Sequence, residues 1–126
     1  AWQIDAARRG ELAVSEKGFV RVGPNLQSVS HPNVYAVGDC AEWTSPLPKA
    51  GVFAVRMGPV LSRNLRAALG DGSPAAFKPQ RHFLALLATA DGSAIGARSG
   101  LHAQGRWLWR LKNRIDRGFV ARFQPP

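Results

Sequence analysis

One segment constrains the fold more than any other: a short apolar run that ends abruptly in glycine and aspartate. Residues 34–37 read Val-Tyr-Ala-Val, and Gly38 and Asp39 follow directly. A continuous apolar run of this kind is typical of a strand that is buried on both faces of a parallel sheet. In such sheets, ligands bind beyond the carboxyl ends of the strands. The segment therefore predicts an α/β fold and makes Gly38 and Asp39 a candidate ligand site.

Two interpretations of this turn follow from the residues alone. Gly38 allows a sharp bend and a close approach between the backbone and a ligand, and the Asp39 carboxylate suits a polyol hydroxyl as its partner. Gly-Asp is also common in plain turns, where the aspartate closes the end of a strand. Cys40, the single cysteine, is expected to be a small core residue. A lone cysteine excludes an intramolecular disulfide and favours a cytoplasmic location.

The segment after this turn predicts a loop and then a helix. Residues 40–48 hold two prolines, which favour a loop. Residues 50–69 predict a helix because apolar side chains recur every four positions. These side chains are Phe53, Met57, Leu61, Leu65 and Leu69. Before the turn, residues 18–22 alternate as a strand does, and residues 26–28 are a candidate return.

The second half of the chain predicts a hairpin and a final helix. Residues 71–80 are rich in Gly, Ser and Pro, which indicates a linker. Asp91 and Gly92 then form a strong hairpin signal between two apolar segments. Residues 106–123 predict an amphipathic helix with an apolar stripe at every fourth position. The stripe consists of Trp107, Leu111, Ile115, Phe119 and Phe123.

The net charge of +9 is concentrated toward the C-terminus. From Lys78 onward, nine Lys/Arg stand against two Asp, a net of +7. A basic amphipathic helix with tryptophans suits an anionic membrane interface. The alternative is that its apolar stripe packs on the hairpin, which needs a covering element, and that its arginines are solvated. No motif favours nucleic acid as the partner.

Several stretches together resemble one family of flavoproteins. Residues 31–41 read His-Pro-Asn-Val-Tyr-Ala-Val-Gly-Asp-Cys-Ala, and residues 46–65 continue from Pro-Leu-Pro-Lys-Ala-Gly-Val-Phe to Ser-Arg-Asn-Leu. This pattern resembles the second FAD-contacting segment of pyridine-nucleotide FAD-dependent oxidoreductases, such as type II NADH dehydrogenases and sulfide:quinone reductases. With the tail at residues 79–87 and 105–119, it looks most similar to the flavoprotein module fused to selenide, water dikinase.

The resemblance implies a cofactor and a set of residues that contact it. In such an enzyme, Asp39 would bind the ribityl or pyrophosphate region of FAD, with Gly38 forming the turn. The backbone of Lys49, Ala50 and Gly51 would approach the pyrimidine edge of the flavin. A helix N-terminus suits that edge because its free N–H groups and positive dipole end favour the charge that hydride transfer leaves there. No catalytic side chain and no metal site are assigned.

The sequence also departs from the complete family pattern. No Gly-x-Gly-x-x-Gly fingerprint for FAD or NAD(P)H occurs in the 126 residues. The glutamine-rich quinone stretch is replaced by Ala-Val-Arg-Met-Gly at residues 54–58, so the electron acceptor, quinone or another, stays open. We therefore expect a fragment that is inactive alone and belongs to an NAD(P)H dehydrogenase, whose missing N-terminal portion is its first partner. As an isolated piece its fold class becomes α+β.

The expected organisation is a remnant of a Rossmann-like FAD-binding domain and a small domain with a hairpin and a basic helix. The boundaries are residues 1–70 for the first, 71–80 for the linker and 81–126 for the second. The inner face of the membrane is the alternative location to the cytoplasm. Competing hypotheses are a stand-alone basic module that binds an anionic surface or nucleic acid, and a ligand-free homodimerisation domain.

Overall fold

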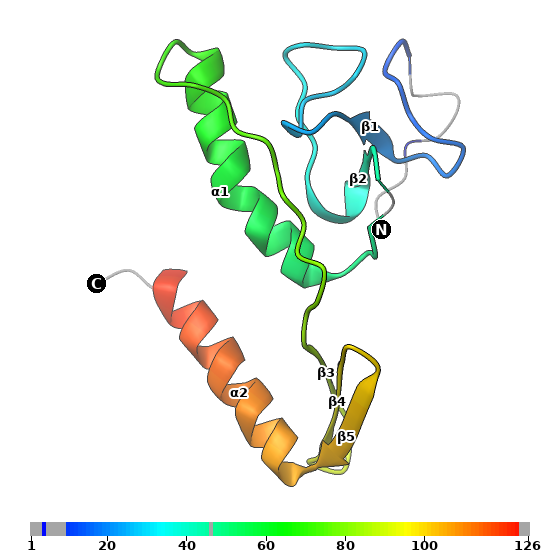
Figure 1. Cartoon of the computed structure of the whole chain (residues 1–126), viewed down its shortest axis with the longest axis vertical. Coiled ribbons are helices and arrows are strands. Elements are labelled where there is room, and N and C mark those ends of the chain that lie inside the picture. The colour runs from blue at the N-terminus through cyan, green and yellow to red at the C-terminus, as the bar shows by residue number, and fades with distance from the viewer. Residues whose placement is uncertain (1–3, 5–9, 46, 124–126) are drawn as a thin grey trace. The chain divides into compact units, whose positions relative to one another are not determined.

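The computed structural model describes residues 4, 10–45 and 47–123, and it is a mixed α+β structure (Figure 1). The chain divides into two compact units after Pro79. In chain order the elements are β1 (Val20–Val22), η2 (Gly38–Cys40), β2 (Ala41–Trp43), α1 (Gly51–Ala68), β3 (Ala85–Ala88), β4 (Ala94–Arg98), β5 (Leu101–Gly105), α2 (Arg106–Val120) and η3 (Ala121–Phe123). This division lies within the predicted linker, whereas the assignment of a function to each part stays a prediction.

The sheet of the first unit differs from the prediction in its second strand. β1, predicted within residues 18–22, pairs in parallel with β2, with Val20 opposite Ala41. The predicted strand at residues 34–37 is wrong, and so is the loop predicted for all of 40–48, which contains β2. Residues 34–36 instead bond back to 26–28, through Ser28 N–H to the Val34 carbonyl at 2.7 Å and Ala36 N–H to the Leu26 carbonyl at 3.1 Å. Local antiparallel pairing thus takes the backbone groups that a parallel strand would need.

A small apolar core lies around this sheet. Its buried members are Val20, Val22, Ala36 and Ala41, and its partly buried neighbours are Ile4, Leu12, Cys40 and Trp43. Burying the apolar side chains on one face of β1 and β2 is the main favourable contribution to folding of so short a sheet. Cys40 is half-buried beside this core and its thiol donates to the Val37 carbonyl at 3.2 Å, which agrees with a core residue.

Helix α1 confirms the predicted helix, but its buried face differs from the predicted stripe. Phe53, Met57 and Asn64 are buried, whereas Leu65 and Leu69 are 42% and 88% exposed. Four residues advance about 40° past one helical turn, so a stripe of every fourth residue winds away from the core. The first members of the stripe are therefore covered and the last ones face solvent.

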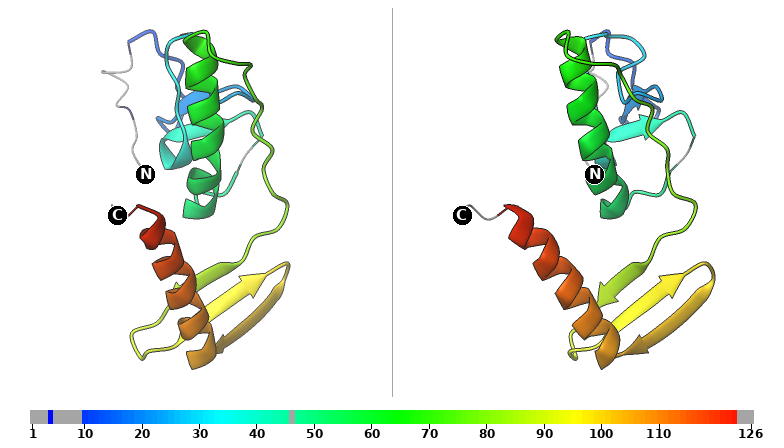
Figure 2. Two further views of the ribbon diagram at one scale, coloured as in Figure 1. Left: turned by 90° about the vertical axis from the view of Figure 1, so that its left-hand side faces the viewer. Right: turned by 60° about the vertical axis from the view of Figure 1, so that its left-hand side comes forward.

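Asn64 fastens the segment after α1 to the first unit. Its side-chain amide donates to the carbonyls of Asn25 and Ala75, at 2.6 and 2.9 Å, and its Oδ1 accepts from the Ala75 N–H at 2.6 Å. Phe77 is buried and its N–H donates to the Pro24 carbonyl at 2.8 Å. The chain consequently runs back along α1 after the turn that follows it (Figures 1 and 2). Residues 71–79 thus pack on the first unit.

The second unit is a three-stranded antiparallel sheet followed by a helix. β3 and β4 form the hairpin predicted around Asp91, with Leu87 opposite Ile95. β5, which pairs with β4, was not predicted. Ser99 and Gly100, with φ of 52° and 84°, make the tight turn that leads into it. Positive φ at both central residues matches the twist of a hairpin, but Ser-Gly inside a short polar stretch gives little warning of it.

Helix α2 and η3 together cover the predicted helix at 106–123, yet this helix barely packs on its own sheet. Leu108 is its one buried residue, and it lies against Gly96 of β4. Within this unit the helix leads away from the sheet after its first turns (Figure 2). The predicted stripe is accordingly exposed, from 36% at Leu111 to 72% at Phe123. No helix in the described part of the chain is long and apolar enough to span a bilayer.

Candidate functional site

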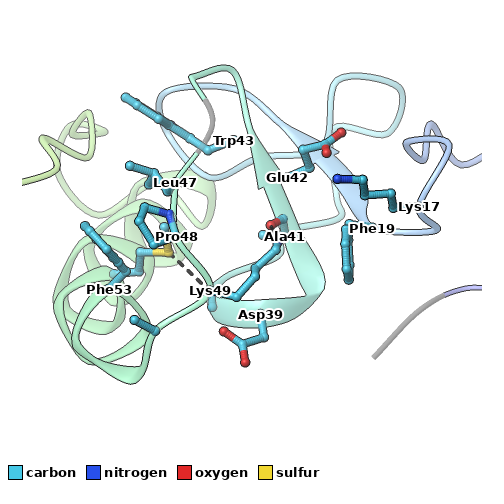
Figure 3. A pocket seen from close by; sticks show the side chains of 13 residues that line it. Lys17, Phe19, Asp39, Ala41, Glu42, Trp43, Leu47, Pro48, Lys49 and Phe53 are labelled. Atoms are coloured by element: carbon cyan, nitrogen blue, oxygen red, sulfur yellow. Dashed lines mark hydrogen bonds between the residues drawn. The ribbon is translucent and has the colours of Figure 1, made fainter. Parts of the chain in front are cut away.

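A cavity of about 220 Å³ lies between β2 and the start of α1. It contains four of the five residues predicted to contact a cofactor. Its lining comprises Lys17, Phe19, Gly38, Asp39, Ala41, Glu42, Trp43, Leu47, Pro48, Lys49, Ala50, Phe53 and Met57 (Figure 3). Folding thus brings the Gly38–Asp39 turn next to the residues that precede α1, as the sequence predicted, although η2 and not a long parallel strand carries the turn.

The Gly38 turn is fixed by the helix rather than left open for a ligand. Gly38 has a φ of +67°, and a Cβ at this position would lie 3.0 Å from the Ala54 Cβ of α1. Its N–H donates to the Met57 sulfur at 3.3 Å, the dashed line in Figure 3. The sharp bend expected at Gly38 is present, but the close neighbour of its backbone is α1. Glycine is needed here for both its conformation and its missing side chain.

Asp39 is the exposed member of this turn. Within the described residues its carboxylate has no hydrogen bond or ion pair. A strand-capping aspartate would instead accept a bond from a nearby backbone N–H, so the plain-turn interpretation lacks its contact. In Figure 3 the side chain lies at the edge of the cavity opposite Trp43. Its acceptor oxygens therefore remain available to a hydroxyl group.

Lys49 is exposed, but two contacts within the protein hold its ammonium group. Its ammonium donates to the Ala41 carbonyl at 2.5 Å and lies 4.0 Å from the centre of the Phe19 ring. A cation over an aromatic face is attracted by the negative ring surface. These two contacts join the approach to α1 to β2 and to the residue before β1. Lys49 thus places a fixed positive charge at the cavity wall.

The N-terminus of α1 adds backbone donors to the site. Ala50 is the cap residue and makes no side-chain hydrogen bond to the first turn, which also contains no acidic residue. Gly51 is exposed, and a Cβ added there would meet no atom within 4 Å. The Phe53 N–H already donates to the Ala50 carbonyl at 3.0 Å, so the first N–H groups, those of Gly51 and Val52, carry the positive dipole end of the helix. This end of α1 therefore suits a polar or anionic acceptor.

Trp43 is a feature of the cavity that the sequence did not reveal. Its ring packs edge-on against Phe77 with a centroid distance of 6.1 Å, and its indole N–H is buried without a hydrogen-bond partner in the described chain. A buried donor without a partner costs free energy. The Phe19–Lys49 contact was likewise not foreseen. Both contacts depend on side chains that the fold brings together from distant positions in the sequence. The one hint in the sequence was an aromatic residue, Trp43, soon after Gly38 and Asp39.

These donors and acceptors fit one part of a dinucleotide cofactor and not the whole of it. A carboxylate suits a ribityl hydroxyl, and a positive helix end suits the electron-rich edge of a flavin. The cavity lies below the usual size of pockets that enclose drug-sized ligands, about 300–1,000 Å³. At this size the cavity could enclose only part of a dinucleotide, and other segments would have to enclose the remainder.

No family model matches the sequence. A comparison with known proteins finds 32% identity over 107 residues with Ferroptosis suppressor protein 1 of Homo sapiens. The match covers 84% of this chain and 27% of the human protein. The chain thus spans about a quarter of the length of this relative.

Proposed function

We propose that this chain is part of an FAD-dependent NAD(P)H oxidoreductase and supplies its second FAD-contacting segment. In the intact protein, electrons would pass from NAD(P)H through FAD to a quinone or another acceptor. The similarity to Ferroptosis suppressor protein 1 across most of the chain supports this general kind of function. The finer resemblance to the module fused to selenide, water dikinase stays part of the proposal, as does the cytoplasmic location.

The observation that carries the proposal is the junction of the Asp39 turn with the uncapped start of α1. An unpaired carboxylate lies at one wall of the cavity, and the backbone donors around Ala50 and Gly51 lie near another. Flavoproteins need both an acceptor for the hydroxyl groups of the cofactor and donors for its pyrimidine edge. A ligand-free dimerisation domain has no need of either.

Each residue would have a defined task in that enzyme. FAD, when bound, supplies the ring that accepts hydride. Asp39 would accept a hydrogen bond from a ribityl hydroxyl and so hold the cofactor in one position. The N-terminal N–H groups of α1 would face the pyrimidine edge, where a positive end stabilises negative charge. Lys49 would reinforce that field while its contacts to Ala41 and Phe19 keep the approach to the helix in place.

The test is the visible spectrum of the complete protein in which this sequence occurs. We expect a yellow protein with bound FAD whose flavin absorbance is bleached by NADH or NADPH without oxygen. A colourless protein that does not take up added FAD would overturn the proposal. The 126-residue chain alone should retain no FAD, because the phosphate-binding loop that supplies much of the dinucleotide affinity has no counterpart in its sequence. Stoichiometric flavin on this chain would contradict the fragment role.

A second proposal concerns the surface of α2 and is favoured by its exposed stripe. Trp107, Ile115 and Phe123 are 58%, 48% and 72% exposed. Among the described residues the one ion pair joins Lys112 to Asp116, so the arginines of this helix lack acidic partners. An apolar stripe flanked by arginines suits the interface of an anionic membrane, where each basic residue contributes about 1 kcal/mol.

Tryptophan fluorescence of a variant that carries Trp2→Phe and Trp43→Phe tests the α2 proposal, because only Trp107 and Trp109 then emit. We expect a blue shift with vesicles that contain anionic lipid, none with neutral lipid, and reversal by salt. Arg110→Gln with Arg114→Gln should weaken the response. An unchanged spectrum with anionic vesicles would contradict the proposal, and a homodimer or nucleic acid would then be tested as the partner.

A further inference from the structure

A second cavity, outside the site described above, lies at the far end of α1. It is an open groove with a volume of about 480 Å³, lined by one face of the helix and by the turn that follows it, and all of its lining residues are exposed. The lining residues are Pro59, Ser62, Arg63, Arg66, Asp71, Gly72 and Ser73. The turn that lines this cavity follows the end of α1 in Figure 1, where the chain begins to run back along the helix. Neither the sequence patterns nor the proposed flavin site assigns it a role.

The turn is held in place by bonds that also satisfy the end of the helix. The N–H groups of Leu69, Gly70 and Asp71 donate to carbonyls of the last turn of α1. The Arg63 Nε donates to the Ser73 carbonyl at 3.0 Å, which orients this guanidinium toward the turn. Because several terminal carbonyls of α1 already accept protein hydrogen bonds, the negative end of the helix is partly neutralised.

The cavity contains many more donors than acceptors. Arg63 keeps its terminal amino groups, and the Arg66 side chain has no protein partner in the described chain. The backbone N–H groups of Gly72 and Ser73 are also unpaired there. Asp71 is the single carboxylate of the lining. Two guanidinium groups and successive free N–H groups are the set that binds oxyanions, and arginine can present two parallel donors to one of them.

We propose that this cavity binds a phosphate group, either as the free ion or as a phosphomonoester. Arg63 and Arg66 would contact its oxygens, with the Gly72 and Ser73 N–H groups and the Ser62 hydroxyl completing the set. Asp71 opposes the anion and limits its affinity. The proposal does not depend on the flavin site, because no residue is shared between the two cavities.

The experiment is an NMR titration of this chain with inorganic phosphate at constant ionic strength, following the Gly72 and Ser73 amide signals. We expect a saturable shift. Arg66→Gln should weaken binding by about three- to tenfold, as expected for loss of one charged hydrogen bond in a partly exposed site. Arg63→Gln should act similarly, and Asp71→Asn should tighten binding.

Arg98→Gln is the matched control, since it removes the same charge from an exposed position in β4. An equal loss of affinity in Arg66→Gln and Arg98→Gln would show general attraction to a basic protein and overturn the proposal. Absence of saturation at Gly72 and Ser73 would also overturn it. A parallel titration with glycerol 3-phosphate distinguishes the source: tighter binding than inorganic phosphate indicates an ester, whose remainder enters the cavity, and equal binding indicates the free ion.

Discussion

The two units of the chain use their apolar residues in opposite ways. In the first unit, Val22, Leu26 and Phe53 are at most 4% exposed. In the second, Leu108 is buried, but Leu87 and Leu101 of the sheet are 68% and 78% exposed and the stripe of α2 faces outward. The first unit therefore closes its own core, whereas the second presents an apolar surface that its own residues do not cover. This contrast suggests a binding site enclosed by packing in the first and a docking surface in the second.

The polar groups show the same contrast. Asn64 is 1% exposed and makes three hydrogen bonds to backbone atoms from two other segments. Polar groups of the second unit are mostly exposed, and the bonds of its hairpin turn join near neighbours in sequence. Buried polar groups specify one arrangement because each alternative leaves them unpaired. The first unit is thus expected to be rigid where α1 meets the segments around Asn25 and Ala75.

The largest expected effect comes from removing the buried amide that fastens the first unit. Asn64→Ala leaves two carbonyls and one N–H without their partner, which should lower the free energy of unfolding by about 3 kcal/mol. Hydrogen exchange of the α1 amides, read by NMR, measures this for the first unit alone. Asn113→Ala in α2 is the control and should have little effect. If the α1 amides exchanged at equal rates in both variants, Asn64 would not be what joins α1 to the segments of Asn25 and Ala75.

Leu108→Ala tests the small core of the second unit. Loss of the side chain that fills the space above Gly96 should destabilise that unit by about 2–3 kcal/mol. Leu111→Ala, one turn further along α2 and 36% exposed, should cost much less. Exchange of the β4 amides reports the difference. A similar cost for both substitutions would show that the stripe of α2 is covered and would remove the contrast between the units.

Two glycine substitutions compare strained and open positions beside the candidate site. Gly38→Ala should destabilise the first unit by about 1–2 kcal/mol, because φ is +67° and the new Cβ would lie 3.0 Å from Ala54. Gly58→Ala lies inside α1 with no atom within 4 Å of the new Cβ, and should stabilise it by about 0.5–1 kcal/mol. Denaturant titrations give both values, and effects of the same sign would contradict the geometry of the turn.

The smallest effect is a pH dependence in the hairpin of the second unit. Hydrogen bonds from the Thr89 hydroxyl and then from the Ser93 N–H lower the pKa of Asp91 from its usual 3.8. A lowered folded-state pKa adds stability above the unfolded pKa, and this stability is lost as pH falls through the folded value. The native hairpin should be more protected than Asp91→Asn at neutral pH, and this advantage should vanish in acid. If the difference in hairpin protection between the native protein and Asp91→Asn did not change with pH, the charge of Asp91 would not stabilise the hairpin.

Local signals in the sequence predicted several elements because their causes are local. The Asp91-Gly92 hairpin depends on adjacent residues, and α1 depends on a repeat within one helix. β2 was missed because its pairing with β1 joins residues 21 positions apart, while the more apolar residues 34–37 are used in a local antiparallel contact. The role of Asn64 could not be predicted, since its partners lie 39 and 11 residues away.

The candidate site was predicted in part for the same reason. Gly38, Asp39 and the start of α1 lie in one short stretch whose order suggested a turn facing a helix N-terminus. The contacts of Gly38 with Ala54 and Met57, and the position of Lys49 over Phe19, arise only when that stretch packs on β1 and α1. The sequence and the family resemblance therefore placed these residues near one another, which the cavity confirms for four of the five, whereas their contact with a ligand stays a prediction.

The central claim is that Asp39 of the first unit contacts FAD, and flavin content of the complete protein tests it most directly. Asp39→Ala should lose a charged hydrogen bond of about 1.5–3 kcal/mol, so flavin per subunit after gel filtration should fall clearly below the native level. Asp71→Asn removes an exposed carboxylate of the same unit that does not line the cavity containing Asp39. This variant should leave flavin content unchanged. Full flavin occupancy in the Asp39→Ala protein would contradict the account.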